Sequence, residues 1–223
     1  MIYILPILAV MLSFGFVATF KPKNKKAVKL LLAFSGAFLL SLTVFDLLPE
    51  IYTEADSKTI GIFIMLGILL QIFLEFFSKG AEHGHVHFKA DAQHFPWLVF
   101  ASLSLHSMLE GLPISDHHSL LIGILIHKIP IAVILSIFFT NAKISLKKAF
   151  FFMLLFAVMT PIGTMITSLT NLLSDYTNIV TALAVGVFLH ISTVILFESS
   201  EGHSFNLSKV LVIILGISIA YII

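Results

Sequence analysis

Residues 106–112 read HSMLEGL and residues 127–130 read HKIP, and each motif stands inside a long run of apolar residues. Ionisable side chains surrounded by lipid are costly, so in membrane-spanning segments they mark ion pathways, bound ions or relays. Three of them, His106, Glu110 and His127, fall on two neighbouring apolar runs. The two motifs therefore predict a membrane protein with an ion site inside the bilayer.

The composition of the 223-residue chain is that of an integral membrane protein. Hydrophobic residues make up 58% of it, charged residues make up 11%, and the mean hydropathy is +1.06. Soluble domains lie far from these values. We expect an all-α fold of eight transmembrane helices, forming one polytopic domain over residues 1–223, because eight apolar segments approach the ~20 residues that a spanning helix needs. These segments are residues 2–20, 28–49, 60–78, 96–115, 119–140, 149–172, 178–198 and 207–223.

Several classes of chemistry are excluded by what the sequence lacks. It has no cysteine, so disulfides and thiolate metal ligands are ruled out. It has neither a Gly-rich phosphate-binding motif nor a basic patch large enough for nucleic acid. We therefore expect no organic cofactor and no nucleic-acid partner. The first apolar segment lacks the basic start and small-residue cleavage site of a signal peptide, and we predict that it is a retained span.

The lysines predict the orientation, since the sequence has no arginine. Basic residues accumulate in the cytoplasmic loops of membrane proteins. One set of alternate loops holds only Lys58, and the other set holds eleven lysines: Lys21, Lys23, Lys25, Lys26, Lys29, Lys79, Lys89, Lys143, Lys147, Lys148 and Lys209. We expect these eleven in the cytoplasm and both termini on the extracytoplasmic side. The expected location is a cell membrane, the inner membrane if the source is bacterial.

The longest predicted loop, about residues 79–95, lies on the cytoplasmic side and is rich in histidine. It contains His83, His85 and His87 at alternate positions. Alternate imidazoles in a flexible chain can reach one ion without a preformed cavity. The sequence leaves two interpretations open, namely loose metal capture by these histidines and a solvated linker.

The spacing of the intramembrane residues predicts one metal site. His106 and Glu110 are four residues apart, so on a helix they share a face. His106 lies about ten residues, or ~15 Å, into its span, which is near the bilayer midplane. His127 lies about as far beyond the following turn, so an antiparallel pair of helices brings both imidazoles to similar depth. We predict His106, Glu110 and His127 as metal ligands, because a purely structural network of three such groups is an expensive way to pack.

Other polar residues in the spans carry weaker signals. Asp46, near the outer end of the second span, is predicted as a further ligand. For His190, in the seventh span, the sequence leaves open a hydrogen-bonded packing residue and a functional role. Glu75 lies near a cytoplasmic helix end, where we expect its carboxylate to reach water.

At these residues the sequence resembles the ZIP (Zrt/Irt-like) family of divalent-metal transporters, over nearly its whole length. The fourth span of that family typically carries a His-Ser or His-Asn pair and then a Gly, as in residues 106–112, and the fifth begins His-Lys or His-Glu, as in residues 127–130. Further similarity comes from residues 46–50 (DLLPE), 161–163 (PIG) and 186–189 (GVFL).

The resemblance implies eight transmembrane helices that move Zn²⁺, or Fe²⁺ or Mn²⁺, toward the cytoplasm by alternating access around a site between spans four and five. The metal ion is then a transported substrate, the expected partners are this ion and the lipid bilayer, and a homodimer is left open. Many relatives hold a second metal with an acidic residue four after the span-five His and a ligand directly after that His. Here Ile131 and Lys128 stand at these positions. We predict that Lys128 takes the space and charge of the second metal, with Ser107 as a neighbouring modulator.

Two alternatives stand beside transport. One is a non-transporting relative that senses metal or scaffolds a partner, motivated by Ile131 and Lys128. The other is an intramembrane metal-dependent hydrolase, which uses histidine ligands and a carboxylate to activate water. The sequence contains no His-Glu-x-x-His motif and no obvious nucleophile motif. We therefore expect that the protein is not an enzyme.

Overall fold

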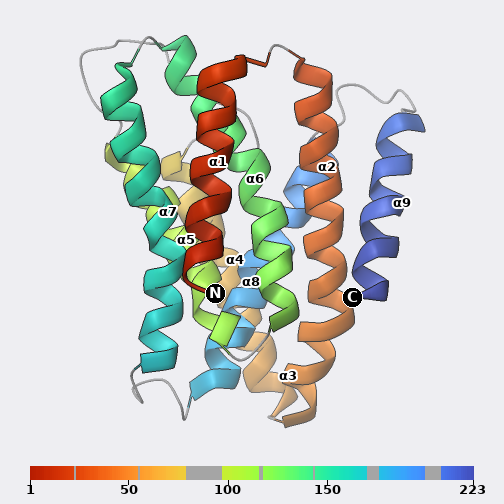
Figure 1. Ribbon diagram of the computed structural model, residues 1–223. Coiled ribbons are helices and arrows are strands. Elements are labelled where there is room, and N and C mark those ends of the chain that lie inside the picture. Colours follow the sequence, from red (N-terminus) through yellow and green to blue (C-terminus); the bar gives the residue numbers. More distant parts are fainter. Residues whose placement is uncertain are drawn as a thin grey trace.

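The computed structural model of the chain (Figure 1) describes residues 1–22, 24–54, 56–78, 97–115, 118–142, 144–169, 176–198 and 207–223. Regular structure in these residues is helical. Helices suit the apolar segments, because lipid offers the backbone no hydrogen-bond partner and a helix satisfies its own N–H and C=O groups. The elements are α1 (Ile4–Phe20), α2 (Lys25–Leu42), the π-helical η1 (Thr43–Leu47), α3 (Leu48–Glu54), α4 (Ser57–Ser78), α5 (Trp97–Gly111), the 3₁₀-helical η3 (Leu112–Ser115), α6 (His118–Asn141), α7 (Leu146–Leu169), α8 (Thr177–Glu198) and α9 (Leu207–Ile222).

Six helical segments in this described part of the chain are long and apolar enough to cross a membrane. One of them, Lys26–Thr53, combines α2, η1 and α3. Two further apolar helices, α1 and α9, are shorter; the 16 residues of α9 span ~24 Å, less than the ~30 Å of a bilayer core. The expected all-α architecture is confirmed, and the apolar helical segments agree in number with the eight predicted spans. The side of the membrane on which the termini lie stays a prediction.

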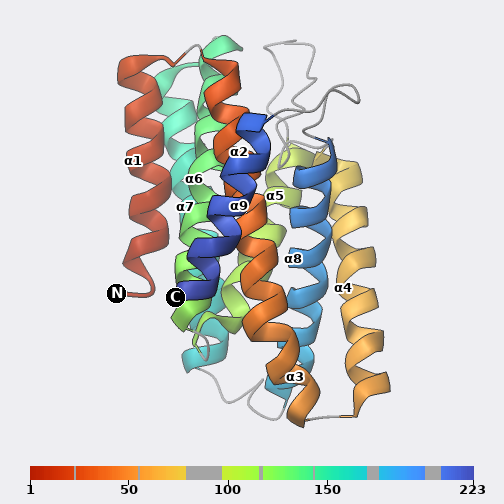
Figure 2. The ribbon, with the colours of Figure 1, turned by 90° about the vertical axis from the view of Figure 1, so that its right-hand side faces the viewer.

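The helices pack as two groups that meet at the centre of the protein. The first group consists of α1, α5, α6 and α7, which share one apolar core. In the second group α4 lies along α8, and α2 lies along both α8 and α9. Figure 2 shows α1 and α4 at opposite sides of the bundle. Contacts of α2 with α6 and of α4 with α5 join the two groups.

Each group contains at least one helix crossing that only glycine permits. A Cβ atom on Gly111 of α5 would overlap the carbonyl oxygen of Thr160 in α7, and one on Gly163 would overlap the carbonyl oxygen of Met108. Gly67 of α4 and Gly186 of α8 meet in the same way. Small residues let helix backbones approach closely in membranes, where packing rather than the hydrophobic effect drives association.

Hydroxyl groups of α7 strengthen the first of these crossings. Oγ1 of Thr160 donates to the carbonyl of Ser107 at 3.0 Å, and Oγ1 of Thr164 donates to the carbonyl of Gly111 at 2.9 Å. Oγ1 of Thr167 donates to the carbonyl of Leu112 at 2.9 Å. These bonds fix the segment of α5 that carries the HSMLEGL motif against α7.

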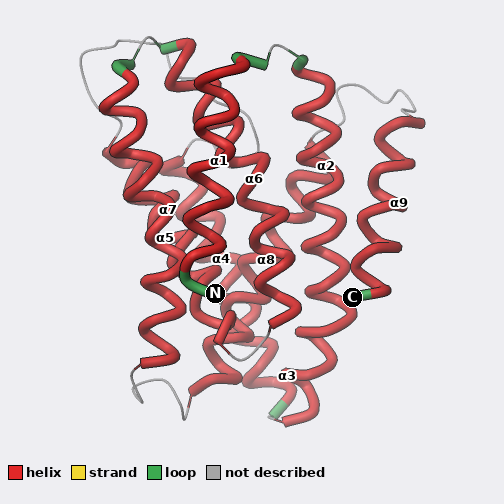
Figure 3. Tube along the Cα trace, in the orientation of Figure 1, coloured by secondary structure: helices red, strands yellow, loops and turns green. Residues whose placement is uncertain are grey.

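Apart from the buried Lys128, the described lysines lie at or near helix ends, as the sequence predicts. Lys21 caps the C-terminus of α1, Lys147 lies in the first turn of α7 and Lys209 lies in the first turn of α9. The C-terminus of α1 and the N-termini of α2, α7 and α9 lie at one end of the bundle, at the top of Figure 3. Lys58 lies in the first turn of α4, at the opposite end. The asymmetry of charge along the sequence is therefore an asymmetry between the two ends of the fold.

Candidate metal centre

Helix α5 places an imidazole and a carboxylate side by side in the interior. His106 and Glu110 are one helical turn apart, and both side chains are 1% exposed. Nε2 of His106 lies 2.9 Å from Oε1 of Glu110. The face of α5 that carries them is turned inward because Ser107 and Gly111 on the adjoining face are held against α7.

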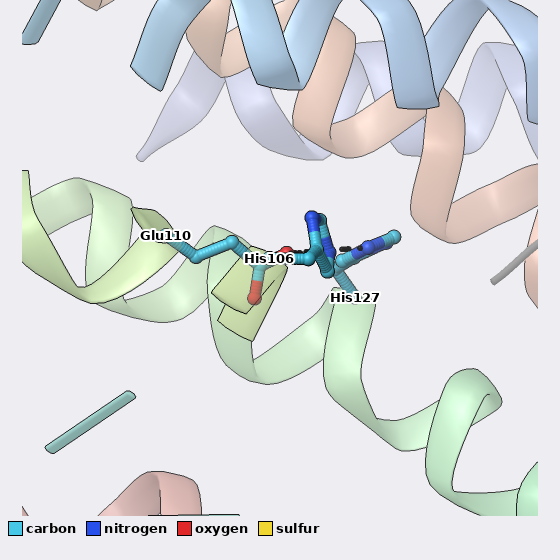
Figure 4. A group of neighbouring side chains, drawn as sticks. All are labelled: His106, Glu110 and His127. Carbon is cyan, nitrogen blue, oxygen red and sulfur yellow. Dashed lines mark ion pairs between the residues drawn. The ribbon is translucent and has the colours of Figure 1, made fainter. Parts of the chain in front are cut away.

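Helix α6 adds a second imidazole to the same carboxylate oxygen. His127 is completely buried, and its Nε2 lies 3.4 Å from Oε1 of Glu110. The rings of His106 and His127 lie nearly at right angles, with centroids 6.2 Å apart. One ligand atom from each of the three residues lies within 4.8 Å of the other two. Figure 4 shows the two imidazoles converging on the Glu110 carboxylate from α5 and α6.

The outward nitrogens of both imidazoles contact helices of the second group. Nδ1 of His106 lies 3.2 Å from Oε1 of Gln71 in α4, and Nδ1 of His127 lies 3.4 Å from Oγ of Ser35 in α2. If Nδ1–H donates to such an oxygen, the Nε2 lone pair is available to a cation at the Glu110 carboxylate. Such outer contacts orient metal-binding imidazoles and make them more basic. The arrangement of the two rings is thus compatible with metal binding.

Lys128 occupies the other side of the Glu110 carboxylate. Its side chain is 1% exposed, and Nζ lies 2.9 Å from Oε2 of Glu110. Nζ also donates to Oγ of Ser107 at 2.7 Å and lies 5.1 Å from the centroid of the Phe156 ring. The two carboxylate oxygens thus have separate environments, with Oε2 facing an ammonium and Oε1 facing two imidazoles.

The donor set suits a borderline divalent cation. Two imidazole nitrogens and one carboxylate oxygen are ligands that Zn²⁺ and Fe²⁺ accept, and affinity for such a site is expected to rise from Mn²⁺ through Fe²⁺ to Zn²⁺. Three protein ligands leave a coordination position open, as in zinc sites whose bound groups exchange. The ammonium of Lys128 cancels the charge of Glu110 and repels an incoming cation, so the ion is held less tightly than by an uncompensated carboxylate.

Not every predicted site residue belongs to the cluster formed by His106, Glu110 and His127. Asp46 lies in η1, is half-buried, and stands outside the group of mutually close ligand atoms. The loop histidines His83, His85 and His87 lie outside the described residues. Ser107, by contrast, contacts the Lys128 ammonium directly.

Sequence reasoning missed three residues that support the cluster. Gln71 and Ser35 contact the imidazoles, and Oγ1 of Thr160 lies 2.9 Å from Oγ of Ser107. Gln71 carried a usable signal, because it is a lone amide within the apolar span 60–78. Ser35 and Thr160 are small hydroxyl residues of a kind common in membrane helices, and nothing in their sequence surroundings distinguishes them.

These features define a multi-span membrane protein with metal-ligating side chains buried between its helices. The family model described as ZIP Zinc transporter matches residues 81–223, which is more than half of the chain and includes α5 to α9. The chain therefore belongs to the ZIP zinc transporter family, whose members are transporters of divalent metals and not enzymes. A comparison with curated proteins found no match.

Proposed function

We propose that this protein moves divalent metal ions across a cell membrane toward the cytoplasm, with Zn²⁺ as the preferred ion and Fe²⁺ or Mn²⁺ as further candidates. The observation that carries the proposal is the convergence of His106, Glu110 and His127, from two adjacent helices, on one buried position. Membership of the ZIP family supports metal transport as the activity. The ligand chemistry supports Zn²⁺.

In this proposal the ion binds Oε1 of Glu110 and Nε2 of both imidazoles. Asp46 is a further ligand on the approach to this position rather than part of it, since its carboxylate stands outside the cluster. The surrounding η1 segment is π-helical, and such segments are frequent at functional sites.

The position of the cluster suits alternating access. Its ligands come from the first helix group, whereas Gln71 and Ser35, which orient the imidazoles, come from the second. A displacement of one group against the other therefore changes the contacts of both imidazoles at once. Release is favoured because Lys128 already neutralises Glu110 and only three protein ligands hold the ion.

Flux of radiolabelled Zn²⁺ into proteoliposomes tests the proposal, because only a transporter moves the ion across a sealed bilayer. We expect the wild-type protein to carry Zn²⁺, and His106→Ala and His127→Ala to lower the flux by at least about ten-fold, since the loss of even an outer-shell partner costs about 10–100-fold. Glu50→Gln is the matched control, since this carboxylate is exposed in the first turn of α3 and does not belong to the group of His106, Glu110 and His127. Near-normal flux in both histidine variants would reject the site.

The orientation of the protein in the membrane needs its own test, which the absence of native cysteine makes simple. Single cysteines at positions 23, 85 and 147 should react with an impermeant thiol reagent only from the cytoplasmic side of cells. Cysteines at positions 59 and 117 should react only from outside. Labelling of position 85 from outside would reverse the proposed orientation.

A non-transporting metal sensor or scaffold is the competing function, and the Lys128–Glu110 contact favours it, since a tethered cation beside the ion position can lock the cluster in one state. A sensor binds Zn²⁺ at the cluster but carries none across the bilayer. Binding that depends on His127, without flux above empty liposomes, would establish this function in place of transport.

A further inference from the structure

A second pair of metal-ligating side chains lies between α4 and α8, outside the cluster. Nε2 of His190 lies 2.7 Å from Oε2 of Glu75, and the two side chains are 15% and 24% exposed. Glu75 stands one turn before Ser78, the last residue of α4. The pair is therefore closer than the cluster to the lysine-bearing end of the bundle, and it is more open.

Polar groups on α4 connect this pair with the cluster. Gln71, which contacts His106, is four residues before Glu75, so both lie on one face of α4 about 6 Å apart along the helix axis. Between them, the carbonyl of Leu74 accepts a hydrogen bond from Oγ of Ser102 in α5. On the face of α4 that contacts the cluster through Gln71, the next turn therefore carries Glu75, whose carboxylate pairs with His190.

Packing alone does not account for the pair. Helix α4 is already held against α8 by the close approach of Gly67 and Gly186. A histidine and a carboxylate in a membrane span are costly and are expected to serve an ion or a proton. Beyond Ser78 the sequence continues directly into the segment that contains His83, His85 and His87.

We propose that His190 and Glu75 form a second divalent-cation site, which a metal ion occupies in transit between the cluster and the end of the bundle where α4 and α8 finish. The transit role rests on the transport function proposed above, whereas the binding does not. Zn²⁺ bonds to the Nε2 lone pair and to a carboxylate oxygen in place of the present hydrogen bond, and the proton of that hydrogen bond leaves to water. With only two protein ligands, water fills the other positions and the ion exchanges readily.

Equilibrium dialysis of radiolabelled Zn²⁺ against the purified full-length protein tests the site. The loop histidines His83, His85 and His87, together with His94, are first replaced by alanine to remove weak Zn²⁺ binding by this segment. We expect this background protein to bind two ions with different affinities. His190→Ala and Glu75→Gln should each remove the weaker one, and His127→Ala should remove the tighter one. Glu75→Gln keeps the size of the side chain and a hydrogen bond to His190, so it guards against loss of folding, and Glu50→Gln is the control for a lost carboxylate.

The same variants in proteoliposomes test the transit role. Glu75→Gln and His190→Ala should lower the maximal Zn²⁺ flux by about ten-fold while the half-saturating concentration changes little, since binding at the cluster is intact. Glu75→Asp, which keeps a ligand, should restore most of the flux. If the wild-type protein binds two ions but carries none across the bilayer, both the transit role and the proposed transport function are wrong, whereas the His190–Glu75 binding site stands. If the background protein binds a single ion, and only His127→Ala removes it, His190 and Glu75 are not a metal site. The same follows if the His190 and Glu75 variants bind as many ions as the background protein but show an altered pH dependence of flux, a result that would assign the pair to proton transfer.

Discussion

The cluster and the His190–Glu75 pair use the same two kinds of ligand in opposite surroundings. The side chains of the cluster are at most 1% exposed and Lys128 compensates their carboxylate, whereas the pair is 15% and 24% exposed. In the proposed transport function, an ion at the cluster must lose most of its water, so the ligands discriminate among ions. An ion at the proposed second site keeps several waters and exchanges quickly. Burial, rather than the type of ligand, then separates a site that selects an ion from one that passes it on.

The largest difference between the two places is expected when the same carboxylate charge is removed at each. Glu110→Gln should abolish tight Zn²⁺ binding and lower the flux by far more than ten-fold, because it removes a direct ligand, and the loss of even an outer-shell partner costs about 10–100-fold. Glu75→Gln should leave tight binding unchanged and lower only the maximal rate. Equilibrium dialysis and Zn²⁺ flux are measured on the Glu110→Gln and Glu75→Gln variants. If both variants lose tight Zn²⁺ binding equally, the two places form a single site.

A smaller effect is expected for the lysine that separates the two environments. Lys128→Met removes the cation that compensates buried Glu110, and breaking such a pair costs about 3 kcal/mol. The thermal transition of the metal-free protein in detergent should therefore fall. Zn²⁺ should restore much of this loss, since the metal supplies the missing positive charge to the same carboxylate. A fall that Zn²⁺ does not reverse would contradict the view that Lys128 stands in for a metal.

The smallest effect is expected for the loop histidines. Replacing His83, His85 and His87 together by alanine should leave the maximal flux largely intact, because neither the cluster nor the His190–Glu75 pair includes them. A moderate rise in the Zn²⁺ concentration needed for half-maximal flux is the expected change. Abolished flux in a well-folded triple variant would move the essential chemistry from the helices to the loop.

Most of the fold could be predicted from the sequence because lipid imposes a simple rule on it. Each apolar run must form a helix, and spacing along one helix places His106 beside Glu110. The meeting of His127 with that pair also follows, since only three residues separate the predicted spans 96–115 and 119–140 and the two histidines lie at similar depth in them. Lys128 follows His127 directly in the sequence, and the structure places its Nζ 2.9 Å from Oε2 of Glu110.

Contacts between helices distant in the sequence could not be predicted in this way. Gln71 and Ser35 reach the imidazoles because α4 and α2 pack across the first helix group, and no local periodicity encodes that arrangement. For the same reason, the position of the Asp46 carboxylate outside the cluster could not be predicted, since it depends on the course of the π-helical η1 segment. The partner of His190 was unknown for the same reason, since Glu75 is 115 residues away in the chain.

We propose that one ion binds between His106, Glu110 and His127, and anomalous scattering from crystals soaked in Cd²⁺ or Zn²⁺ measures where it binds. We expect one strong peak at bonding distance from Nε2 of both imidazoles and from Oε1 of Glu110, with Lys128 still on Oε2. A weaker peak between His190 and Glu75 is compatible with it. Two well-occupied ions ~4 Å apart, as in two-metal sites, would contradict it, and so would an empty cluster.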